Sequence, residues 1–121
     1  MATHNDLGKQ GEAIAKRYLE ENGYEILDEN WTHGKAEIDL IGYRNGLMVF
    51  VEVKARSSVA FGAPEDFVNR AKQKQMEQAS LAYIELMNHQ REIRFDVIAI
   101  TFTKNYSYTL KHIEDAFWPE G

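Results

Sequence analysis

A chain of 121 residues is long enough to bury a hydrophobic core in one domain, and we expect a single domain over residues 1–121. It contains no cysteine, which excludes disulfide frameworks, cysteine zinc sites and thiol nucleophiles and favours a reducing, cytoplasmic location. The formal net charge of -5 argues against a non-specific nucleic-acid coat, since such binding comes mainly from Lys and Arg. No apolar run is long enough for a membrane span or a signal peptide.

The first predicted element is a helix from Asp6, as its N-cap, to Asn22, with Gly23 as the C-terminal stop. A strand over Tyr24–Leu27 follows and leads into an irregular polar link through residues 30–33. The small and apolar residues that recur on one side of the helix include Leu7, Gly11, Ala15, Tyr18 and Leu19.

Two strands are predicted next, over Ala36–Tyr43 and Leu47–Arg56. The Asn45-Gly46 pair between them is the strongest short signal for a β-hairpin, so these strands should pair antiparallel. The second strand is apolar on both faces over residues 48–51, which is typical of a central strand that is covered on both sides. Helices must provide that cover.

The rest of the chain predicts one more helix and two more strands. After a loop around residues 61–64, a helix from about Asp66 to Met87 precedes strands over Arg94–Phe102 and Tyr106–Ile113. The predicted order is therefore α-β-β-β-α-β-β. The apolar face of this second helix consists of Val68, Met76, Ala79, Tyr83 and Leu86.

The hairpin register brings two acids together. With a two-residue turn at Asn45-Gly46, Asp39 faces Glu52 across the two strands. Opposed side chains on one face have Cβ atoms roughly 5 Å apart, and like charges there are destabilising unless something lies between them. Hard divalent cations such as Mg²⁺ or Mn²⁺ prefer such oxygen ligands.

The same register places Glu37 opposite Lys54, and strand alternation puts Glu52 and Lys54 on one face. An ammonium beside a metal-bound water can orient that water or stabilise the charge that builds on phosphate. The alternative is an ordinary solvated strand face whose exposed ion pairs contribute little.

Two further charged residues break their local pattern. Glu12 lies at the edge of the apolar stripe of the first helix, either as a third metal ligand or as an N-terminal acid that the helix dipole favours. Lys72 falls near the centre of the second helix's apolar face, where it either extends its ammonium to solvent or reaches the acidic patch.

Several short segments together resemble the YraN-like family of uncharacterised bacterial proteins, which looks like a branch of the PD-(D/E)xK nuclease superfamily, close to archaeal Holliday-junction resolvases. This resemblance implies a restriction-endonuclease-like α/β fold, with a mixed central sheet flanked by helices in three layers. The matching segments are Leu7-Gly8, Gly11-Glu12, Asn30-Trp31, Glu37 to Ile41, Phe50 to Lys54, Arg94 to Val97 and Ala116-Phe117.

The resemblance also implies a site and an activity. Glu12, Asp39 and Glu52 would hold Mg²⁺ or Mn²⁺, Lys54 would complete the catalytic set, and Lys72 is a weaker candidate for substrate binding. The implied activity is an endonuclease that cleaves DNA, with branched or junction DNA preferred, and a homodimer would supply two sites for two strands. The alternatives are an RNA-processing nuclease and a non-catalytic module that binds nucleic acid or protein.

Overall fold

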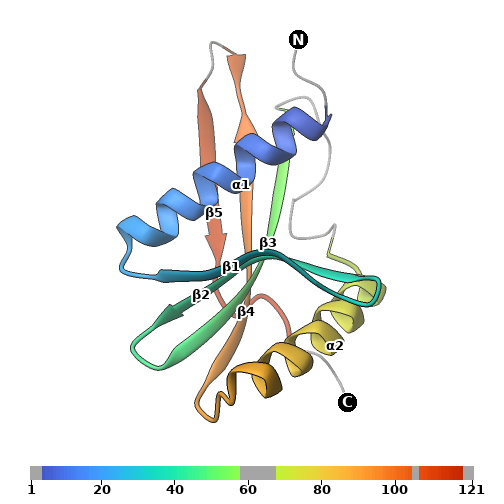
Figure 1. Cartoon of the computed structure of the whole chain (residues 1–121). Helices are drawn as coiled ribbons and strands as arrows, with labels where there is room; N and C mark the ends of the chain where they lie inside the picture. The colour runs from blue at the N-terminus through green and yellow to red at the C-terminus, as the bar shows by residue number, and fades with distance from the viewer. Residues whose placement is uncertain (1–3, 58–67, 105–106, 119–121) are drawn as a thin grey trace.

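The computed structural model describes residues 4–57, 68–104 and 107–118, and within them the predicted order of helices and strands is confirmed (Figure 1). Of the described helices, neither is long and apolar enough to cross a membrane. The elements are α1 (His4–Glu21), β1 (Glu25–His33), β2 (Ala36–Arg44), β3 (Leu47–Ser57), α2 (Arg70–Met87), β4 (Ile93–Phe102) and β5 (Tyr108–Ile113).

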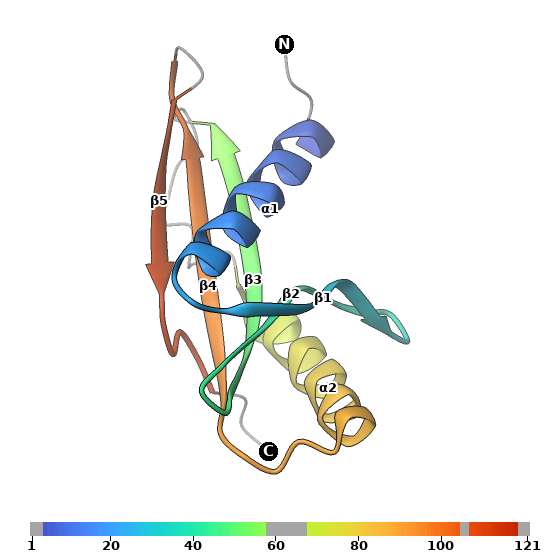
Figure 2. The same ribbon diagram turned by 60° about the vertical axis from the view of Figure 1, so that its left-hand side comes forward.

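The strands form one mixed sheet in the order β1-β2-β3-β4-β5. β3 and β4 are parallel, with α2 in the crossover between them, and the other neighbouring strands are antiparallel. Figure 2 shows the β1–β2 hairpin passing between α1 and α2. The predicted α/β fold, a mixed sheet with a helix on either side, is confirmed.

The core has two halves, one on each face of the sheet. Met48 and Phe50 of β3 pack on the α2 side with Met76 and Tyr83, whereas Val49 and Val51 pack on the α1 side. All four β3 side chains are at most 2% exposed. The expectation that helices cover both faces of β3 is therefore confirmed. The run of apolar residues in β3 is explained by the burial of the strand on both faces.

The boundaries of α1 differ from the prediction at its N-terminus. The helix begins at His4, so Asp6 lies in the first turn and is not the N-cap. A carboxylate is favourable in either position, because the first-turn N–H groups carry the positive end of the helix dipole. At the other end the helix stops at Glu21, and Gly23 takes a positive φ of 87°, as expected of a C-terminal stop.

The predicted irregular link after Leu27 is wrong, because β1 continues to His33 and pairs with β2 as far as Ala36. Two irregularities in the backbone explain why the sequence pattern did not predict the second half of this strand. The pairing register shifts between Ile26 and Asp28, and Asn30 has a φ of 50°. A bulge and a left-handed residue break the period of two on which a strand prediction depends.

The second helix begins later than predicted. Asn69 is the N-cap, and its side chain accepts a hydrogen bond from the backbone N–H of Lys72, so α2 begins at Arg70 rather than Asp66. The predicted loop at residues 61–64 lies outside the described residues. Leu86 was assigned to the buried face but is 68% exposed, whereas Ser80 is buried. The remaining strand ends differ from the prediction by one or two residues.

A glycine in α1 sets the distance between this helix and β3. A Cβ at Gly11 would lie 2.7 Å from the Cβ of Ala55, closer than real carbon atoms approach. We expect Gly11→Ala to lower the free energy of unfolding by about 1–3 kcal/mol, because α1 must move outward. Gly8→Ala is the matched control: nothing lies within 4 Å there, and the change should stabilise by up to about 1 kcal/mol.

Urea denaturation of both variants measures these changes. The double change Gly11→Ala with Ala55→Gly removes the contact from the other side and should recover part of the loss. Equal stability of the Gly11→Ala and Gly8→Ala proteins would contradict the close approach of α1.

Candidate functional site

The candidate site lies where the β2–β3 hairpin opens. Asn45 and Gly46 both have positive φ angles, 52° and 86°, which is the type I′ turn expected of this pair. The predicted register holds from this turn to the Leu40–Val51 pair. The pairing of β2 with β3 ends there, so the expected opposition of Asp39 to Glu52 as a backbone pair does not form, nor does that of Glu37 to Lys54.

The side chain of Asp39 bridges this opening. The backbone N–H of Val53 donates a 2.8 Å hydrogen bond to Oδ2 of Asp39, in place of a backbone carbonyl of β2. Asp39 is 8% exposed, so the bond is protected from water. A strand register derived from sequence assumes backbone pairing throughout, and a side chain that replaces one carbonyl ends it.

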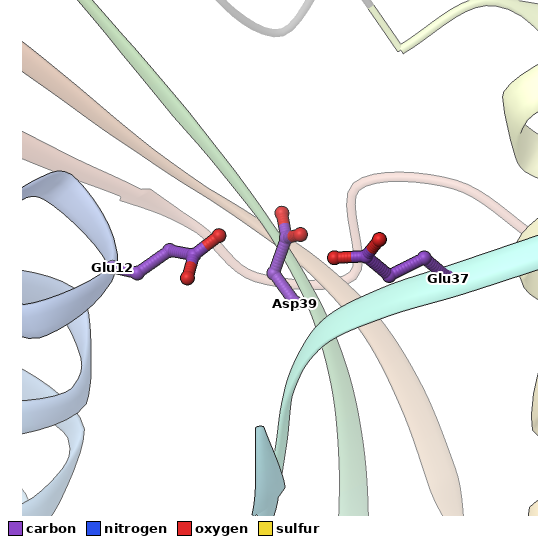
Figure 3. Close-up of side chains that lie close together, drawn as sticks. All are labelled: Glu12, Glu37 and Asp39. Atoms are coloured by element: carbon purple, nitrogen blue, oxygen red, sulfur yellow. The ribbon is translucent and has the colours of Figure 1, made fainter. Parts of the chain in front are cut away.

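Three carboxylates converge beside this opening. Glu12 reaches across from α1, Glu37 extends along β2, and Asp39 stands between them (Figure 3). One oxygen of each lies within 4.8 Å of the others. Glu12 is eight residues beyond His4, so it is far from the first turn and the helix-dipole alternative does not account for it. Glu37 was not predicted as a member of such a group.

The electrostatic cost of this arrangement is visible at Glu12. Its pKa is raised above the ordinary value by partial burial first and by the charge of Asp39 second. A hydrogen bond from the side chain of Asn30 acts in the opposite direction. Glu12 is therefore held near other negative charges, which destabilises its ionised form unless a cation lies between them.

Glu52 is the most strongly affected acid. It is 4% exposed, and burial, then a hydrogen bond to Asp39 and the charge of Asp39, raise its pKa to about 8. The ammonium of Lys72 lies 3.1 Å from Oε2 of Glu52, yet that oxygen has no partner with hydrogen-bond geometry among the described residues. The contact is therefore an ion pair whenever Glu52 is ionised, and it leaves the lone pairs of Oε2 without a hydrogen bond.

Lys72 thus reaches the acidic patch rather than solvent, as one of the two alternatives expected. Its Nζ also donates to the backbone carbonyl of Glu37 at 3.4 Å, a long hydrogen bond. Lys54 is partly buried on the same face of β3 as Glu52, and its positive charge lowers the pKa of that acid. Two lysines from different elements therefore flank one buried carboxyl group.

The donor set matches the preferences of a hard divalent cation. The cluster offers only carboxylate oxygens, and Mg²⁺ binds such oxygens at about 2.0–2.1 Å in octahedral geometry, which puts adjacent ligands about 3 Å apart and opposed ligands about 4.2 Å apart. The three oxygens lie within 4.8 Å of one another, so side-chain rotations that draw them together would let them share one ion. Glu12, Glu37 and Asp39 are the residues that could hold the ion, with Glu52 beside Asp39 as a fourth candidate.

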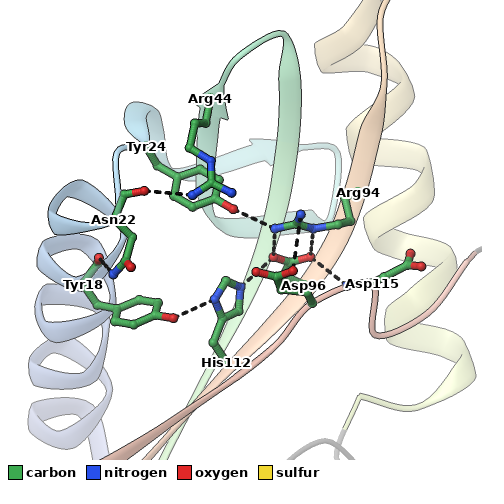
Figure 4. Close-up of polar contacts among 9 residues, drawn as sticks. Tyr18, Asn22, Tyr24, Arg44, Arg94, Asp96, His112 and Asp115 are labelled. Atoms are coloured by element: carbon green, nitrogen blue, oxygen red, sulfur yellow. Dashed lines mark hydrogen bonds and ion pairs between the residues drawn. The ribbon is translucent and has the colours of Figure 1, made fainter.

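A second polar cluster lies on the α1 face of β4 (Figure 4). Asp96 is fully buried and accepts two 2.8 Å hydrogen bonds from the guanidinium of Arg94 and one of 2.7 Å from His112. His112 also contacts the hydroxyl of Tyr18 at 3.0 Å, and Arg94 donates to the hydroxyl of Tyr24. The cluster ties α1 and the start of β1 to β4 and β5.

Hydrogen bonds keep the buried carboxyl group of Asp96 ionised. Burial is the largest influence and raises its pKa, but the bonds from His112, Arg94 and the backbone of Asp115 together lower it. Asp96 is therefore a paired anion in a structural network. His112 lies beside Asp96 through the pairing of β4 with β5, in which Ile98 pairs with His112.

The chain is similar to proteins from many bacteria. The sequence pattern of UPF0102, an uncharacterised protein family, matches residues 11–100. UPF0102 proteins of Flavobacterium psychrophilum and Bacteroides thetaiotaomicron are 46% and 41% identical, and each alignment covers 98% of both chains. A relative from Chlorobium chlorochromatii is 42% identical over 95% of this chain and 93% of its own. The chain therefore belongs to the uncharacterised protein family UPF0102, as the resemblance to the YraN-like family predicted.

Proposed function

We propose that this protein is a cytoplasmic Mg²⁺- or Mn²⁺-dependent nuclease of the PD-(D/E)xK type, which hydrolyses phosphodiester bonds of DNA. The observation that carries this proposal is the convergence of Glu12, Glu37 and Asp39 beside buried Glu52. Four acids this close together are costly to ionise at the same time without a cation. A site of this composition is suited to phosphate chemistry because bound cations would offset the repulsion of the substrate.

Each side chain has a separate task in this proposal. Glu12, Asp39 and Glu52, joined by Glu37, would hold the metal, which supplies Lewis acidity and lowers the pKa of a bound water. Lys54 lies beside Glu52 on β3 and would orient the attacking water or stabilise charge that develops on the phosphate. Branched or junction DNA is the preferred substrate class, and a homodimer would cut two strands symmetrically.

Lys72 has a distinct place in the proposal. Its ammonium lies 3.1 Å from the Glu52 carboxyl group and supplies positive charge to the site. If Glu52 held a metal, the ammonium would be free to bind a substrate phosphate. Lys72 is therefore proposed as a substrate-binding residue.

The test measures metal binding and cleavage separately. Calorimetry with Mn²⁺ should show binding, and labelled junction, flap, single-stranded and duplex DNA, together with RNA, should reveal which substrate is cut. Lys54→Met should keep Mn²⁺ binding and lose about a hundredfold or more in cleavage, because an electrostatic catalytic group is removed. Lys104→Met, which removes an exposed charge after β4, is the matched control. Wild-type protein that neither binds Mn²⁺ nor cuts any of these substrates would refute the proposal.

A second candidate is a non-catalytic module that binds nucleic acid or protein. The Lys72–Glu52 ion pair favours it, because a lysine can hold the acidic patch together without a metal. Filter binding across a salt series separates the two functions. A metal-dependent nuclease should bind nucleic acid more tightly when Ca²⁺ is added, whereas a module of this kind should not respond.

A further inference from the structure

The outer side of α1 carries a hollow that begins at the candidate metal site. The hollow has a volume of about 490 Å³, and Glu12 is part of its wall. Its other lining residues come from α1, except for Glu29 of β1. The carboxylate of Glu12 is thus shared between the acidic cluster and the hollow, so whatever occupies the hollow lies next to the cluster.

The α1 residues of the hollow form one stripe along the helix. Lys9, Ala13, Lys16, Arg17 and Glu20 are separated by three or four positions, or by one within the same turn. From Lys9 to Arg17 the helix rises about 12 Å. One strand of a duplex carries a charge about every 3.4 Å, so this length matches about three or four phosphates. Ala13 in the middle leaves space between the cations.

The charges of the stripe are only partly compensated. Lys16 makes a 2.9 Å ion pair with Glu29, and Glu12 is turned toward Asp39 in the acidic cluster. Lys9 and Arg17 are exposed, and neither has an ion pair within the described part of the chain. Two cations, one on each side of Glu12 along the helix, are therefore available to a polyanion.

We propose that the outer face of α1 from Lys9 to Arg17 is the surface on which the phosphate backbone of the nucleic acid lies as it enters the metal site. This inference rests on the proposed function and assigns it a substrate-binding surface. The lining of the hollow is itself balanced, with Lys9, Lys16 and Arg17 against Glu12, Glu20 and Glu29. A net charge of -5 for the whole chain therefore does not prevent Lys9 and Arg17 from binding a phosphate backbone locally. A cation in the cluster would offset the charge of Glu12 and leave the stripe positive.

The experiment measures binding of a labelled duplex and a labelled single strand over a salt series, once with Ca²⁺ and once with EDTA. At 0.1 M salt, Lys9→Gln and Arg17→Gln should each weaken binding about eightfold for the duplex and about fivefold for the single strand. Each should reduce the slope of log affinity against log salt by about 0.9 for duplex or about 0.7 for a single strand. Glu20→Gln, which removes a negative charge from the same stripe, should tighten binding.

Arg91→Gln is the matched control, because Arg91 is exposed and packs across the Gly46 turn at the end of the hairpin opposite to the candidate site. Wild-type binding that Lys9→Gln and Arg17→Gln weaken no more than Arg91→Gln does would overturn the proposed surface and leave the nuclease proposal standing. Absence of any nucleic-acid binding by the wild type would overturn both. A loss at Lys9 and Arg17 that persists in EDTA would support the surface independently of the metal.

Discussion

Asp39→Asn should lower cleavage by at least about a thousandfold and abolish Mn²⁺ binding while the protein remains folded. Asp39 stands between Glu12 and Glu37 in the cluster and also interacts with Glu52, so one substitution removes the centre of the whole donor set. A metal ion supplies several kcal/mol of transition-state stabilisation, and about 4 kcal/mol corresponds to a thousandfold in rate. Single-turnover cleavage with saturating substrate measures this loss.

Asn is preferred to Ala at this position for a structural reason. The carboxylate of Asp39 accepts the 2.8 Å hydrogen bond from the N–H of Val53, and the amide oxygen of Asn can still accept it. The opening of the hairpin is therefore preserved, and circular dichroism should match that of the wild type. Glu85→Gln, an exposed acid near the end of α2, is the control and should cleave normally. Undiminished cleavage by Asp39→Asn would remove this cluster from the catalytic site.

Glu52→Gln should become progressively more stable than the wild type as the pH rises from about 5 to 9 in EDTA. In the folded protein the pKa of Glu52 is raised from 4.5 to about 8, chiefly by burial and next by Asp39. Between these values the folded state holds a proton that the unfolded state has released. The free energy of unfolding of the wild type therefore falls as the pH rises through this window.

The size of this effect follows from the same two values. One pKa unit corresponds to about 1.4 kcal/mol, so the difference between 4.5 and about 8 sets an upper limit of about 5 kcal/mol for the destabilisation above pH 8. Gln has no charge to bury, so the variant should lack this dependence. Denaturant titrations of both proteins at several pH values measure it, with Glu85→Gln as the control for loss of an exposed acid. A stability difference that stays constant with pH would contradict a buried, protonated Glu52.

Bound metal should counteract the loss of wild-type stability as the pH rises. The metal stabilises only the folded state and requires the ionised carboxylate, so Mn²⁺ binding should release protons and strengthen as the pH rises toward 8. The stability gap between the wild type and Glu52→Gln should therefore narrow when Mn²⁺ is added at pH 8.

The amino-acid sequence predicted the order of the elements and named three residues that meet at the candidate site, Asp39, Glu52 and Lys54. Period-of-two and helical patterns, together with Asn45-Gly46, specified the hairpin and its register up to the Leu40–Val51 pair. The run of apolar residues in β3 predicted a central strand, because a strand that is buried on both faces needs apolar side chains on both faces. Glu52 and Lys54 share a face by strand alternation, which is a local property of the chain, whereas the register expected to oppose Asp39 to Glu52 ends one pair earlier.

Contacts between side chains of different elements could not be predicted from patterns along the chain. Glu37 joins Glu12 because the hairpin leaves β3 at Asp39, and that departure depends on a side-chain hydrogen bond to Val53 that no periodic pattern encodes. His112 meets Asp96 through the pairing of β4 with β5, and Lys72 meets Glu52 across the α2–β3 interface. Patterns along a chain report which face a residue occupies, whereas contacts between distant segments depend on packing distance, such as the close approach that Gly11 permits.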